Sequence, residues 1–143
     1  MKFIRSATLA LTGAVLLSSC QHLKITAQNH GAKIEESGRE GIMRVTLEAR
    51  AAERIGLETA KVLEEGSGST TRSVVPYGAI MYDTKGDTWT FTNPEPLVFV
   101  RQRVVVQAIE GDRVILSEGP TPGTVVVTVG AAELMGVEHK YGQ

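Results

Sequence analysis

The second half of the chain consists of short runs of β-branched and aromatic residues separated by turn-forming residues. Residues 88–92 (TWTFT) alternate strictly, which predicts a strand with Trp89 and Phe91 on one face. Four turns rich in Gly, Pro, Asp and Asn separate the runs: residues 83–87, 93–96, 110–112 and 119–123. Strands recurring about every ten residues are typical of small antiparallel barrels or sandwiches. We therefore expect residues 73–143 to form a mainly β domain, a small antiparallel β-barrel.

Residues 42–63 are expected to contribute a strand and one short helix. An apolar stripe recurs at four-residue intervals, at Leu47, Ala51 and Ile55. Thr46 is the expected N-cap of this helix and Gly56 its C-cap. So short a helix is marginal alone, so we expect the segment to pack on the barrel and cover an open edge. Residues 64–72 (EEGSGSTTR) are expected to be a linker.

The first nineteen residues have the pattern of a secretory signal. Lys2 and Arg5 precede the uncharged apolar stretch 7–17. As a helix this stretch would span about 16 Å, against a hydrocarbon core of about 30 Å. We therefore expect residues 1–19 to be a signal peptide rather than a membrane-spanning helix.

Residues 17–20 (LSSC) resemble the lipobox of bacterial lipoproteins. The resemblance implies cleavage between Ser19 and Cys20, and acylation of Cys20, which would anchor the chain in membrane lipid. The alternative is an ordinary buried or free cysteine. The resemblance places the protein on the periplasmic side of a bacterial membrane, and Gln21 favours the outer membrane. The polar residues 20–41 are expected to be a flexible tether.

Composition excludes several classes of protein. A formal net charge of −1 over 143 residues provides no basic face for nucleic acid. One cysteine cannot form an intramolecular disulfide. Hydrolase, metalloprotease and phosphate-loop motifs are not found, so we expect neither an enzyme nor a cofactor.

Two blocks of the chain resemble one protein family. The quoted positions are residues 45–47, 54–62, 75–80, 89, 99–104, 111–114, 119–127 and 130–134. They are similar to the membrane-proximal part of the periplasmic adaptor subunits (membrane fusion proteins) of RND-type efflux pumps. The resemblance implies a permuted SH3-like barrel that sits on a transporter's periplasmic face. In full adaptors several hundred residues, including a helical hairpin, separate the two blocks. Residues 64–72 stand in their place, so we expect a module that does not bridge two membranes.

Arg101 and Arg103 lie two residues apart and therefore on one face of the expected strand. One interpretation makes them a docking contact for an acidic partner surface, such as a transporter or adaptor subunit. The other makes them a solvated strand face or ordinary ion pairs, and we favour it. Trp89 and Phe91 are expected in the core rather than in a ligand stack.

Methionine and histidine side chains invite a soft-metal interpretation, because thioether and imidazole suit Cu(I). The residues concerned are Met43, Met81, Met135, His22, His30 and His139. Their spacing is not that of metal ligands, so we expect the methionines to fill core gaps and no metal to bind.

Two functional hypotheses remain open. The first is a lipid-anchored periplasmic module that binds an RND transporter or adaptor component and contributes to efflux. The second is a free-standing envelope lipoprotein whose barrel binds a small ligand or a metal ion. A degenerate adaptor without a function of its own is a third, weaker alternative.

Overall fold

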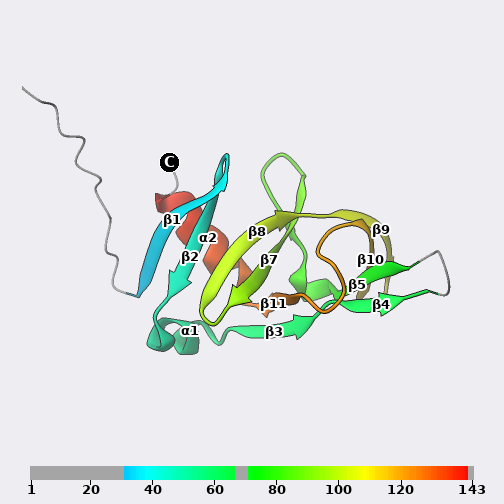
Figure 1. Ribbon diagram of the computed structural model, residues 1–143, viewed down its shortest axis with the longest axis horizontal. Coiled ribbons are helices and arrows are strands. Elements are labelled where there is room, and N and C mark those ends of the chain that lie inside the picture. Colours follow the sequence, from blue (N-terminus) through cyan, green and yellow to red (C-terminus); the bar gives the residue numbers. More distant parts are fainter. Residues whose placement is uncertain (1–30, 67–70, 142–143) are drawn as a thin grey trace, which may run out of the picture.

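The computed structural model describes residues 31–66 and 71–141 (Figure 1). The expected signal peptide, Ser19 and Cys20 lie outside these residues. The N-terminal elements are β1 (Ala32–Arg39), β2 (Ile42–Leu47), α1 (Ala49–Ile55), β3 (Glu58–Lys61) and β4 (Leu63–Glu65). The central elements are β5 (Arg72–Pro76), a 3-10 turn (Tyr77–Ala79), β6 (Met81–Tyr82), β7 (Thr88–Glu95) and β8 (Val98–Arg103). The C-terminal elements are β9 (Val105–Glu110), β10 (Arg113–Glu118), β11 (Val125–Val129) and α2 (Ala131–Tyr141).

The strands form two antiparallel sheets. The larger sheet has the order β1-β2-β8-β7-β11-β3, and β6 pairs with one end of β7. The smaller sheet has the order β4-β5-β10-β9. The expected mainly β, antiparallel fold with a short helix is confirmed.

The sheets do not close into the expected barrel. In the described part of the chain, β1 and β3 are the edges of the larger sheet, and β4 and β9 those of the smaller one. The larger sheet instead buries one face under α2, which packs against β1 and β2 (Figure 1). A helix on the sheet supplies the second layer that closure would otherwise provide.

The main core lies between the larger sheet and the helices. Its buried members are Val45, Leu47, Met81, Phe91, Phe99, Val127, Ala131 and Leu134. A second core joins the two sheets and contains no aromatic residue: Val62, Val75, Ala79, Val104, Val114, Leu116 and Val126. Val104 lies between β8 and β9, so the chain passes from one sheet to the other through this core.

Part of the expected tether is ordered. Residues 32–41 form β1 and the turn into β2, and Ile34 pairs with Val45. Ala32 and Ile34 pack against the main core, while Lys33 and Glu35 are exposed. This short alternation is enough to form an edge strand because β2 offers an apolar neighbour.

Residues 42–63 join the rest of the domain through strand pairing. β2 pairs with β8, and β3 pairs with β11. The expected linker 64–72 is shorter than predicted, because its ends belong to β4 and β5, which pair with each other. Residues 42–63 are thus an integral part of the fold.

The short helix begins later than expected, and a second helix follows the last strand. Thr46 lies in β2, and α1 begins only after Glu48, whereas Gly56 is its left-handed C-cap, as predicted. The second helix, α2, begins directly after Gly130 and continues through Gly136 to Tyr141. Burial of Leu134 and Glu138 on one face outweighs the modest cost of a helical glycine. Within the described residues, neither helix is long and apolar enough to cross a membrane.

Candidate functional site

Arg101 is the centre of a buried polar cluster. Its side chain on β8 reaches α2, where Nε lies 3.0 Å from Oε2 of Glu138. Arg101 Nη2 donates a hydrogen bond of 3.1 Å to the Gly41 carbonyl, and Glu138 Oε1 accepts one of 3.1 Å from the Met43 N–H. The pair therefore joins β8, α2 and the β1–β2 hairpin.

The cluster is well buried, since Arg101 is 8% and Glu138 3% exposed. Nε and Oε2 are at ion-pair distance but are not aligned as a hydrogen bond. The guanidinium also lies over the Trp89 ring, with Cζ 4.2 Å from the ring centroid. Because removal of either charge would leave the other buried without its partner, we assign the pair to holding α2 in place.

Asp83 organises the loop beside Trp89. Its Oδ2 accepts a 3.0 Å hydrogen bond from the indole N–H, and its Oδ1 accepts the N–H groups of Lys85 and Asp87. Desolvation alone would raise the pKa of Asp83, but these hydrogen bonds outweigh it, so the pKa lies below its usual value. The indole N–H of Trp89 thus has an internal partner, as does its ring face.

The structure separates the two arginines proposed for docking. Arg101 is buried in its ion pair, so its assignment as a docking contact is wrong. Arg103 is exposed and pairs with Asp87, with 2.6 Å between Nη2 and Oδ1. Both arginines form ion pairs, but only Arg103 lies on a solvated face, and partner binding by Arg103 stays a prediction.

The core interpretation of the aromatic residues is also confirmed. Phe91 is fully buried, and Trp89 is partly buried against the main core. Met81 belongs to the same core, and Met135 packs against it. Among residues 31–66 and 71–141, no group of three His, Cys, Asp or Glu side chains is placed to hold a metal ion.

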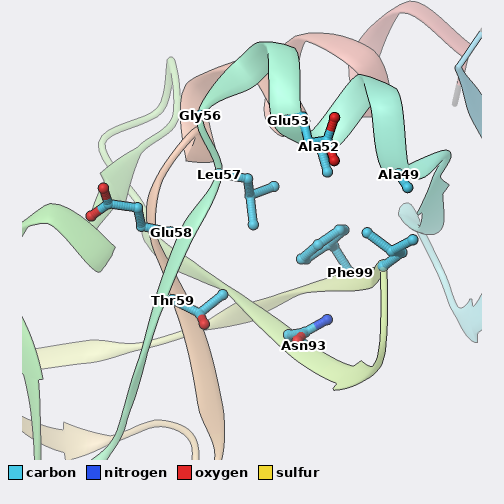
Figure 2. A pocket seen from close by; sticks show the side chains of 10 residues that line it. Ala49, Ala52, Glu53, Gly56, Leu57, Glu58, Thr59, Asn93 and Phe99 are labelled. Atoms are coloured by element: carbon cyan, nitrogen blue, oxygen red, sulfur yellow. The ribbon is translucent and has the colours of Figure 1, made fainter.

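A pocket of about 550 Å³ opens under α1 and is lined in part by Phe99 of the main core (Figure 2). Its helical wall is formed by Ala49, Ala52 and Glu53. Leu57 and Phe99 supply apolar surface opposite, and Asn93 lies beyond the Phe99 ring in Figure 2. Small side chains on α1 leave this space open, because an alanine reaches only one carbon beyond the backbone.

The sequence patterns considered above did not single out Glu138 or the residues of this pocket. Glu138 lies four residues after Leu134, and this spacing places it on the buried helix face. An acidic residue on a buried face is a signal for an ion pair, but it does not identify the partner. The pocket arises from the packing of residues 49–59 against residues 93–99, two segments that are distant in sequence.

Comparison with protein-family models, with curated proteins and with solved structures finds no match to this chain.

Proposed function

We propose that the protein is a lipid-anchored periplasmic module, related to the adaptor subunits of RND efflux pumps, that binds a transporter or adaptor component. One structural observation carries the proposal. The two adaptor-like blocks of the sequence, which are distant in full adaptors, fold here into one sheet through β2–β8 and β3–β11. This arrangement is the one expected of a membrane-proximal module from which the intervening domains are missing.

The helices of the described residues also support this proposal. α1 has 7 residues and α2 has 11, so neither extends beyond the body of the domain. A long helical hairpin is the part of an adaptor that reaches an outer-membrane channel. Its absence from residues 31–66 and 71–141 is in keeping with docking rather than bridging.

The anchor can be tested by labelling with radioactive palmitate in bacteria. The wild-type chain and a Ser18→Ala variant, which keeps a small residue before the cysteine, should both incorporate label. Cys20→Ala should incorporate none and should leave the membrane fraction. Label on Cys20→Ala, or no label on the wild type, would contradict lipidation at this position.

The partner can be tested by crosslinking in the native host, followed by purification from detergent. An RND transporter or adaptor subunit should be recovered with the chain. Arg103→Glu should lower the yield, whereas Arg72→Glu, a change at another exposed arginine, this one on the smaller sheet, should not. Recovery of no RND component after crosslinking would refute the proposal.

The pocket under α1 favours a second candidate, an envelope lipoprotein that binds a small ligand. Its volume falls in the range of about 300–1,000 Å³ that is usual for small-molecule sites. A ligand that raises the melting temperature in proportion to its concentration, and fails to do so in Leu57→Gln, would support this candidate.

A further inference from the structure

The pocket under α1 extends down to the side chains of the main core, which leave it open. Phe99, which is only 1% exposed, lies at its base, and partly buried Leu57 and Leu97 line it. In Figure 2 the Phe99 ring lies between α1 and the strands below. An apolar side chain entering here would therefore contact core residues directly.

The charges around the pocket have one sign. Glu53 on α1 and Glu58 at the start of β3 line it, and the carboxylate of neither makes an ion pair or a hydrogen bond within the described residues. Lysine, arginine and histidine are absent from the lining. The nearby Glu95 differs, because Arg44 already pairs with it. Two unpaired carboxylates beside an apolar base favour an occupant with positive charges next to an apolar side chain.

The pocket also borders an open strand edge. β3 pairs with β11 on one side and is the last strand of the larger sheet. Glu58 and Thr59, at the start of β3, both line the pocket. An extended segment lying along this edge can hydrogen-bond to the backbone of β3 while it places a side chain in the pocket.

Leu97 holds an unusual backbone conformation at the pocket wall. Glu95 pairs with Val98, so Pro96 and Leu97 form the turn between β7 and β8. Leu97 has φ of 62°, a left-handed value that normally belongs to Gly or Asn at such a position. A leucine occupies this turn although its backbone preference is against it, and its side chain adds apolar surface to the pocket.

From these features we infer that the pocket under α1 is the docking site for an extended segment of a partner protein that carries an apolar side chain between basic residues. Leu57, Leu97 and Phe99 receive the apolar side chain, and Glu53 and Glu58 bind the flanking cations. The inference rests on the proposed function, since it identifies the face of the module that contacts the transporter or adaptor component.

Two labelled five-residue peptides test the site on the full chain in non-ionic detergent, by fluorescence anisotropy. One alternates lysine with leucine, and the other has glutamate in place of lysine. The lysine peptide should bind at least tenfold more tightly, and its affinity should fall with added salt. The double variant Glu53→Lys with Glu58→Lys should reduce its affinity at least tenfold, and Leu57→Gln should reduce it as well.

A matched double variant, Glu36→Lys with Glu64→Lys, makes the same change of charge away from the pocket. Its affinity for the lysine peptide should stay within twofold of the wild type, and all variants should melt near the wild-type temperature. Equal binding of both peptides, or equal losses in the two double variants, would overturn the inference. So would a concentration-dependent dimer that the pocket variant abolishes, because the occupant would then be a second copy.

The two proposals fail separately. Recovery of an RND component by crosslinking, without specific peptide binding, would refute the docking site alone. Specific peptide binding, with no RND component recovered, would refute the proposed partner but not the chemistry of the pocket.

Discussion

The two hydrophobic cores of the protein, one on the larger sheet and one between the sheets, are built from different side chains. The larger sheet has a helix on one face, and its core contains Phe91, Phe99 and Leu134. The core between the sheets is built of valines, with Ala79 and Leu116 as the other buried members. Aromatic residues bury more surface each, whereas β-branched residues fit closely spaced strands.

Each sheet also has an ion pair that connects separate strands or helices, and the two pairs differ in burial. Arg101–Glu138 is buried beneath α2. In the smaller sheet, Arg113 on β10 pairs with Glu65 on β4, with 2.6 Å between Nη2 and Oε2. By strand register both side chains lie on the same face as Val74 of the intervening β5, which is 2% exposed. The exposed pair therefore crosses over a valine.

The difference in burial means that the two ion pairs contribute differently to the stability of the fold. A buried pair fixes one arrangement, because neither charge can lose its partner without a large cost. An exposed pair contributes little through its charges, since water and salt screen them. The larger sheet should therefore depend on its pair, and the smaller sheet on its valine core.

The largest effect is expected from Glu138→Ala. It leaves the Arg101 guanidinium buried without its carboxylate, which should lower the free energy of unfolding by about 3–5 kcal/mol. Urea denaturation measures the change. The double variant Arg101→Met with Glu138→Leu should restore most of the loss. A cost below about 1 kcal/mol for Glu138→Ala would show that the buried pair is dispensable.

Leu116→Ala should have the next largest effect. The substitution leaves a cavity in the core between the sheets and should cost about 2–5 kcal/mol. Hydrogen exchange should show faster opening of β5 and β10 than of β7 and β8. Equal loss of protection in both sheets would mean that they unfold as one cooperative unit.

Leu97→Asn should raise the free energy of unfolding, by less than the two preceding substitutions lower it. Asparagine accepts a left-handed backbone more readily than leucine, so the variant should gain up to about 1 kcal/mol in stability. Leu97→Ala is the control, because it keeps the strained backbone and loses the side chain, and should destabilise. If both variants destabilise equally, packing of Leu97 outweighs the strain.

The smallest effect is expected at the exposed pair. The hydrogen bond from Arg113 holds the pKa of Glu65 below its usual value of 4.5, and the pKa of Arg113 is raised in return. A depressed carboxyl pKa stabilises the fold above pH 4.5, and this contribution is lost as the pH falls through the folded-state pKa. Arg113→Gln should move the Glu65 pKa back towards 4.5, as measured by NMR titration, with a smaller shift for Arg72→Gln. An unchanged pKa in Arg113→Gln would refute the assigned cause.

Much of the strand content could be predicted from sequence because turn residues and alternation are local signals. Residues 88–92 and Gly56 adopt the predicted conformations for this reason. β1 was missed because its only apolar signal is Ala32 and Ile34, in a polar context. Its stability depends on pairing with β2 and on the core beneath, which are tertiary effects.

The candidate site was less predictable. Arg101 and Arg103 have the same residue type and belong to the same strand, yet α2 covers one of them and not the other. Local sequence contains no information on which part of a strand a distant helix will cover. The same limit applies to the pocket, whose shape depends on how α1, β3 and the β7–β8 turn meet.

The interleaved strand order has a consequence for how the chain is made. β2 and β3 are synthesised early, but their partners β8 and β11 come much later. Contacts between such distant segments form slowly, because a long loop must close first. A chain that emerges from its N-terminus can pair β1 with β2 early, but it keeps β3 unpaired until almost all of it is released. During that interval β3 can associate with chaperones or with other nascent chains.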